Sequence, residues 1–107
     1  MAHNEDLLMK LSTCAAACEA CMDACLDEDN LEMMVDCIRT DRDCAKICRM
    51  AAGFVASHSE FAGAVLTLCE DVCESCAEEC DKHEHDHCKR CAAACRECAE
   101  ACSNYAA

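Results

Sequence analysis

Cysteines recur along this sequence at intervals of three and four residues, and this spacing constrains the fold more than any other feature. One series is Cys14, Cys18, Cys21 and Cys25, and a second series with the same spacing is Cys69, Cys73, Cys76 and Cys80. A third series is Cys88, Cys91, Cys95, Cys98 and Cys102, and a sparser one is Cys37, Cys44 and Cys48. Because an α-helix turns by about 100° per residue, such intervals return to one helix face. The pattern predicts four helices, each with a face of thiols.

Polar residues and helix caps divide the chain between these series. Asn4 is a candidate N-cap for the first helix, and Asp29 or Asn30 is one for the second. Gly53 is expected to end the second helix. The run Ser57-His58-Ser59-Glu60 is typical of a capping box that opens the third. We therefore expect helices over about residues 4–27, 30–52, 58–81 and 85–104.

Short connections between long helices imply antiparallel neighbours. A chain of 107 residues is also the size of one domain. No alternating run of β-branched residues suggests a sheet. We expect residues 1–107 to form a single all-α domain, an antiparallel up-down-up-down four-helix bundle with a cysteine-lined core.

The thiols have a structural explanation and a chemical one. Free cysteine packs as a small hydrophobic residue, so one or two on a core face need no other role. This chain has 16 on the inner faces of all four predicted helices. A core made for stability alone would use Leu and Ile, which bury more area and resist oxidation. The cysteines are therefore predicted to be metal ligands.

Many cysteines in a short chain ordinarily indicate a secreted disulfide scaffold. Against that, the N-terminal run Met1-Ala2-His3-Asn4-Glu5-Asp6 lacks the pattern of a signal peptide. The chain has no Pro and only two Gly, unlike loop-rich disulfide proteins. No apolar run approaches the roughly 20 residues that span a bilayer. We expect a cytoplasmic protein without membrane contact, and its net charge of −13 disfavours nucleic acid as a partner.

The ligand type narrows the choice of metal. Thiolates favour Cu(I), zinc or iron–sulfur clusters, and the spacing C-x₂-C-x₂-C-x₃-C-P of cluster proteins is absent. Structural zinc sites are closed groups of four ligands, whereas helical stripes make a continuous column. Cu(I) accepts two or three thiolates. Each Cu(I) ion adds one positive charge, so a number of ions similar to the number of thiolates nearly neutralises them, as a buried core requires. Several Cu(I) ions are the expected cargo, in a bundle that also folds without metal.

Two other functions remain open. The first alternative is a zinc or general heavy-metal buffer, because the charge argument ranks the metals without excluding zinc. The second is a dithiol redox protein, which is less favoured. Its C-x-x-C pairs lie inside predicted helices, away from the helix N-termini where a thiol pKa is lowered. No Ser-His-Asp or Cys-His catalytic arrangement is present, so we do not expect an enzyme.

The predicted topology makes the two ends of the bundle chemically different. One end gathers Met33, Met34, His83, His85 and His87 beside the outermost cysteines. The other end gathers apolar side chains: Leu7, Leu8, Leu11, Phe54, Val55, Phe61, Val65, Leu66 and Tyr105. We expect the apolar end to seal the bundle and the His/Met end to admit copper. The alternatives are a simple polar loop for the histidines and ordinary core packing for the methionines.

Taken together, the cysteine series resemble the cytosolic copper storage proteins over essentially the whole chain. The resemblance rests on the C-x₃-C-x₂-C-x₃-C runs at 14–25 and 69–80, the longer run at 88–102, and Asp43-Cys44-Ala45-Lys46-Ile47-Cys48. It implies multinuclear Cu(I)–thiolate clusters along the core, a homotetramer, and histidine-assisted uptake at one end. A protein that stores copper would also have a copper chaperone as a candidate partner. The second helix departs from the pattern, because Asp41 stands where a cysteine would continue the series. Three roles are open to Asp41: a ligand, the partner of a Lys or Arg, or a surface residue.

Overall fold

Four long helices account for most of the chain. The structure is a computed structural model that describes the backbone of residues 2–105 and the side chains of residues 4–105. Within that range the elements are α1 (Ala2–Cys25), a short 3₁₀ segment η1 (Leu31–Met34), α2 (Val35–Ala56), α3 (Ala62–Cys80) and α4 (Asp86–Ser103). The described residues contain no strand.

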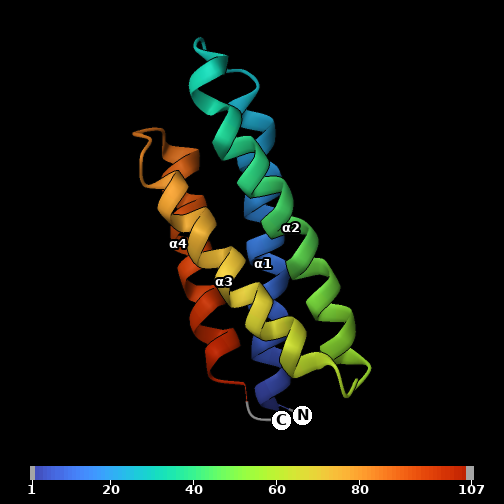
Figure 1. Ribbon diagram of the computed structural model, residues 1–107. Helices are drawn as coiled ribbons and strands as arrows, with labels where there is room; N and C mark the ends of the chain where they lie inside the picture. Colours follow the sequence, from blue (N-terminus) through green and yellow to red (C-terminus); the bar gives the residue numbers. More distant parts are fainter. Residues whose placement is uncertain (1, 106–107) are drawn as a thin grey trace.

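The helices form an elongated antiparallel bundle, about 44 × 18 × 17 Å. Each helix packs against the next one in the chain, and α1 also packs against α4. The start of α1 and the end of α4 lie at one end of the bundle, together with the α2–α3 connection (Figure 1). The α1–α2 and α3–α4 connections lie at the other end, which we call the mouth (Figure 1). The predicted up-down-up-down four-helix bundle is confirmed.

The core consists mainly of sulfur and small aliphatic groups. All 16 cysteines are buried and free. At the end opposite the mouth, Leu7, Leu11, Val55 and Leu66 are buried. The partly buried side chains that pack against the core include Leu8, Phe54, Val65 and Tyr105. Phe61 is the exception among the residues predicted to seal this end, because it precedes α3 on the surface and is 60% exposed. A cysteine-lined core with an apolar seal is thus present.

Several predicted helix ends were wrong, three of them in α1 and α2. Asn4 is not an N-cap, because α1 already includes Ala2. The predicted second helix is divided into η1 and α2, and the Asn30 side chain makes no capping hydrogen bond. Gly53 lies inside α2, which continues to Ala56. The helix continues past Gly53 because the next turn still has a core contact to make, through the buried Val55.

The run predicted to open α3 instead closes α2. Ser57 is the C-cap of α2, and His58 adopts a left-handed conformation with φ 54°. The His58 N–H donates to the Val55 carbonyl at 3.1 Å, and the Ser59 N–H donates to the Phe54 carbonyl at 3.0 Å. These two bonds are those of a Schellman motif, with His58 in the position that usually holds glycine. The α3 helix begins only at Ala62, four residues later than predicted.

Among residues 2–105, none of the helices combines the length and the apolar character needed to cross a bilayer.

Candidate metal centre

The cysteine thiols meet in overlapping groups along the bundle axis. Within each group the ligand atoms all lie within 4.8 Å of one another. Four of the five groups that follow share members with a neighbour, so the thiols form a column and not a set of separate sites. The groups include Cys48, Cys69, Cys73 and Cys98; Cys14, Cys44, Cys48 and Cys73; Cys14, Cys18, Cys44 and Cys95; Cys18, Cys76, Cys91 and Cys95; and Cys21, Cys25, His87 and Cys88.

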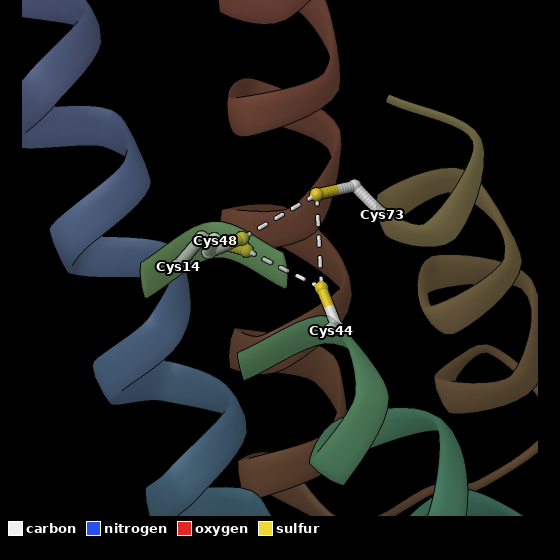
Figure 2. A group of neighbouring side chains, drawn as sticks. All are labelled: Cys14, Cys44, Cys48 and Cys73. Atoms are coloured by element: carbon white, nitrogen blue, oxygen red, sulfur yellow. Dashed lines mark hydrogen bonds between the residues drawn. The ribbon is translucent and has the colours of Figure 1, made fainter. Parts of the chain in front are cut away.

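One central group illustrates how several helices contribute ligands. Figure 2 shows Cys14 from α1, Cys44 and Cys48 from α2, and Cys73 from α3 turned toward one another. The Sγ–Sγ distances are 3.8 Å for Cys14–Cys44, 3.6 Å for Cys44–Cys73 and 3.8 Å for Cys48–Cys73. Helix α4 adds Cys95, whose sulfur lies 3.7 Å from that of Cys14. No single helix supplies a complete group, so the ligand sets exist only in the folded bundle.

These distances suit metal binding better than disulfide formation. A disulfide bond needs a sulfur separation of about 2.05 Å, well below the spacing here. Two sulfurs bound to one metal at about 2.3 Å lie about 3.8 Å apart in a tetrahedron and about 4.0 Å apart in a trigonal plane. The Cys14–Cys44 distance of 3.8 Å and the Cys21–Cys37 distance of 4.0 Å already match those values. A metal can therefore enter the column with little movement of the helices.

Asp41 is part of this column. Its side chain is fully buried, and its Oδ1 lies 3.2 Å from the sulfurs of both Cys76 and Cys91. Cys80 approaches the same oxygen at 3.7 Å, and Cys37 approaches Oδ2 at 3.8 Å. The carboxyl group thus links the thiols near the mouth with those deeper in the bundle. Two of its three predicted roles are excluded, because it is not on the surface and the side chains described here offer it no Lys or Arg.

Burial governs the charge of this core. Desolvation raises the pKa of Asp41 far above its usual range, and the neighbouring sulfurs of Cys91 and Cys76 act in the same direction. Desolvation likewise raises the pKa of Cys25 and Cys88. In the metal-free bundle, Asp41, Cys25 and Cys88 are therefore neutral.

The mouth contains the group in which a histidine joins the thiols. His87 Nδ1 lies 3.3 Å from Cys21 Sγ and 3.6 Å from Cys88 Sγ. His87 Nε2 lies 2.8 Å from a carboxylate oxygen of Glu28, a residue that no sequence motif singles out. The only signal for Glu28 in the sequence is its place in the acidic loop after the first cysteine series. The spacing H-x-H-x-H, in contrast, does identify His87.

The mouth also contains a thiol with a lowered pKa, that of Cys21. Hydrogen bonds from Cys37 and Cys80, together with the nearby His87, lower the pKa of Cys21 to about 5. Burial opposes the charging of His87, but its contacts with Cys21 and Glu28 outweigh that effect and raise its pKa. The contact between the two side chains thus lowers the pKa of Cys21 and raises that of His87.

The other residues predicted for the mouth lie around it at different depths. His85 stacks on His87 with ring centroids 5.3 Å apart and planes 2° apart. His83 Nε2 lies 3.1 Å from a carboxylate oxygen of Glu79. Met34 is buried, whereas Met33 is 64% exposed. A pocket of about 400 Å³ is lined by Met33, Met34, His83 and His85, together with Glu28, Asp29, Asn30, Lys82 and Glu84.

The whole chain, residues 1–107, matches the family model described as copper storage protein. The chain belongs to the copper storage protein family. A Bacillus subtilis (strain 168) relative, the uncharacterized cysteine-rich protein YhjQ, is 46% identical over 81 residues, which are 76% of this chain and 75% of the relative.

Solved copper storage proteins have the same fold. The structure described as Cu(I)-bound copper storage protein BsCsp3 is 42% identical, with a TM-score of 0.93 and coverage of 98% of this chain and 99% of that one. A cytosolic copper storage protein from Streptomyces lividans, solved with five coppers, is 40% identical, with a TM-score of 0.91 and coverage of 94% and 89%. The cysteine-rich bundle is thus the fold of copper storage proteins.

Proposed function

We propose that this member of the copper storage protein family holds several Cu(I) ions as thiolate clusters in its core, in the cytosol. The observation that carries the proposal is the column of 16 free, buried thiols with overlapping ligand groups. A metal that accepts two or three shared thiolates can fill such a column throughout. The solved relative BsCsp3, described as Cu(I)-bound, supports the choice of metal.

Copper is proposed to enter at the mouth. His87 bridges the outside and the first thiols, because one ring nitrogen faces Cys21 and Cys88 while the ring edge reaches the protein surface at 14% exposure. Met33, Met34, His83 and His85 line the outer pocket and provide soft or borderline ligands for an ion in transit. At the opposite end the buried side chains described are apolar ones such as Leu7, Leu11 and Leu66, so the two ends are not equivalent.

Zinc storage is the second candidate, and the same geometry gives it a definite form. Three of the four-ligand groups share no residue: Cys14, Cys44, Cys48 and Cys73; Cys18, Cys76, Cys91 and Cys95; and Cys21, Cys25, His87 and Cys88. Each suits one tetrahedral zinc ion. Zinc would therefore saturate the protein at about three or four ions.

Anaerobic titration distinguishes the two metals. Cu(I) added against a competing chelator should saturate at or above one ion per pair of cysteines, which is eight or more for 16 cysteines. Zinc should saturate at half that number or below and should be displaced by Cu(I). Saturation by about four zinc ions that Cu(I) fails to displace would contradict copper storage and favour the zinc buffer.

The role of the mouth is tested by comparing histidines in the same loop. We expect His87→Ala to slow the first phase of copper loading, because it removes the ring that contacts Cys21 and Cys88. His83→Ala should have a smaller effect, because His83 bonds to Glu79. Capacity at equilibrium should stay nearly unchanged in both variants. Unchanged kinetics for a variant that lacks His83, His85 and His87 would rule out uptake at this end.

Three further features belong to the proposal. We expect no catalytic activity, since the thiols are all buried within helices and serve as a ligand store. A homotetramer would cover some of the large apolar side chains that are exposed in the single chain, among them Met9, Met50, Phe61 and Leu68. A copper chaperone is the expected donor. Native mass spectrometry of the metal-free and loaded protein measures the oligomeric state directly.

A further inference from the structure

The carboxylate of Glu28 contacts His87 on the side of the ring that faces away from the thiols. Glu28 Oε2 lies 2.8 Å from His87 Nε2 and 3.5 Å from His85 Nδ1. Glu28 follows the end of α1, where its backbone N–H donates to the Cys25 carbonyl at 3.2 Å. The backbone thus ties Glu28 to a residue of the outermost thiol group, while its side chain reaches across the mouth to the start of α4.

The hydrogen bond to Glu28 determines which ring nitrogen faces the thiols. An ionised carboxylate only accepts hydrogen bonds, so His87 Nε2 carries the proton. In the neutral ring Nδ1 is then left with its lone pair. That nitrogen is the one that lies 3.3 Å from Cys21 Sγ and 3.6 Å from Cys88 Sγ. A ring turned over would present a C–H to the thiols, and a ring protonated on Nδ1 would present an N–H. Neither could bind a metal there.

The stacked neighbour contributes to the same restraint. His85 covers one face of the His87 ring, with the two planes within 2°. His85 is the outer ring of the pair, with a side chain 41% exposed against 14% for His87. Because one oxygen of Glu28 lies close to both rings, the carboxylate holds the stack as a unit. The orientation of His87 therefore depends on Glu28 more than on any other polar side chain described at the mouth.

We propose that Glu28 is a positioning residue for copper uptake and that it acts through His87. The proposal rests on the proposed uptake at the mouth. In metalloproteins, carboxylates that hold a ligating histidine fix its tautomer and ring orientation, and their loss typically lowers metal affinity or activity about 10- to 100-fold. Glu28 does not hold the copper ion. It keeps Nδ1 of His87 available, so that an ion arriving from the surface meets a nitrogen ligand and the first thiols together.

Loading kinetics measure the effect. With Cu(I) supplied by a chelator under anaerobic conditions, Glu28→Ala should slow the first phase about tenfold and leave the final capacity unchanged. Glu28→Gln should keep most of the rate, because the amide oxygen still accepts from Nε2. Asp27→Ala is the matched control: it removes the same charge from the neighbouring, exposed position and should leave the rate within about twofold of the wild type.

A spectroscopic measurement separates positioning from a general structural effect. In the metal-free protein, ¹⁵N chemical shifts of the His87 ring should report a single tautomer, protonated on Nε2. Glu28→Gln should preserve that tautomer, and Glu28→Ala should give a mixture of the two. Far-ultraviolet circular dichroism should be the same for all variants, because Glu28 lies in the connection after α1 and not in a helix.

The outcomes are distinguishable from a failure of the mouth itself. If His87→Ala slows loading but Glu28→Ala does not, uptake at the mouth stands and the role of Glu28 is overturned. The role of Glu28 is also overturned if Asp27→Ala slows loading equally, since the effect would then be one of charge, or if Glu28→Ala retains a single tautomer. If His87→Ala also loads at the wild-type rate, the proposed uptake at the mouth is wrong.

Discussion

Asp41 places a carboxyl group in the core of the bundle, where its burial lowers the stability of the metal-free protein at neutral pH. The carboxyl group is fully buried among thiols from every helix: Cys37 on α2, Cys76 and Cys80 on α3, and Cys91 on α4, with Cys21 of α1 also acting on its pKa. Burying such a group costs free energy unless it is neutral and hydrogen-bonded. Its raised pKa means that the bundle binds a proton at Asp41 on folding.

The sign of the resulting pH dependence follows from that raised pKa. The stabilisation by a protonated Asp41 is complete below the unfolded-state pKa, near 4, and is lost as the pH rises toward the folded-state value. Over that range the loss is about 1.4 kcal/mol per pH unit. We expect Asp41→Asn to stabilise the metal-free protein by about 2–3 kcal/mol at pH 7 and by much less at pH 4.5. Urea unfolding of the reduced, metal-free protein at the two pH values measures this.

Asp43→Asn is the matched control for this prediction. Asp43 lies on the same helix but is 58% exposed and pairs with Arg42. Its substitution should change the free energy of unfolding by no more than about 0.5 kcal/mol at either pH. If Asp41→Asn instead destabilises the protein at pH 7 and leaves the pH dependence unchanged, Asp41 is ionised in the metal-free core.

Among the elements, the α2–α3 connection departs most from local sequence rules. The only glycine of α2 is in the helix interior, where a Cβ at Gly53 would meet no atom within 4 Å. The left-handed position that ends the helix is occupied by His58, with φ 54°. Glycine in a helix interior costs roughly 0.5–1 kcal/mol relative to alanine. A residue with a Cβ loses about 1–2 kcal/mol in the left-handed region. A residue with a Cβ would therefore suit position 53 better, and glycine would suit position 58 better.

Substitutions that give each of the two positions its preferred residue type should stabilise the bundle. We expect Gly53→Ala to raise the free energy of unfolding by about 0.5–1 kcal/mol and His58→Gly to raise it by about 1 kcal/mol. The two effects should add approximately, since they act on different backbone positions. Denaturant midpoints of the single and double variants measure this. A destabilising Gly53→Ala would mean that Gly53 itself ends the helix, as glycine commonly does.

The positions of the helices also show why the periodic spacing of the cysteines predicted the structure better than the candidate capping residues did. The thiol faces could be predicted because intervals of three and four fix a helix face whatever the ends do. The ends depend on which of several nearby polar residues the tertiary contacts select. Val55 extends α2 past Gly53 because it is buried, and this made Ser57 a C-cap. The role of Glu28 could not be predicted from the sequence either, because it depends on a tertiary contact. Its partner His87 is 59 residues away and meets it only in the folded bundle.

At the scale of the whole molecule, the constraint on storage is charge. The chain already carries a formal net charge of −13, and its core has no Lys or Arg among the described buried residues. Buried thiolates without metal would add to that charge inside an apolar interior. Neutral thiols avoid this, and exchange of each thiol proton for one Cu(I) leaves the total charge unchanged. A bundle filled with one Cu(I) per thiol therefore carries the same total charge as the metal-free bundle with neutral thiols.

Proton release during loading tests this charge balance across the whole core. Metal binding requires deprotonated thiols, so a core that is neutral without metal must release protons as it fills. We expect up to about two protons per Cu(I) while each ion takes two thiols, falling toward one per ion as loading approaches one Cu(I) for each of the 16 thiols. The first ion should release fewer, because the pKa of Cys21 is already lowered to about 5. A weakly buffered anaerobic titration with a pH indicator, using Cu(I) stabilised by acetonitrile, measures the ratio. Zinc should release up to about four protons per ion, since each ion takes four thiols. A copper titration with almost no proton release would mean that the metal-free core holds thiolates, and charge compensation would then have to come from cations other than protons.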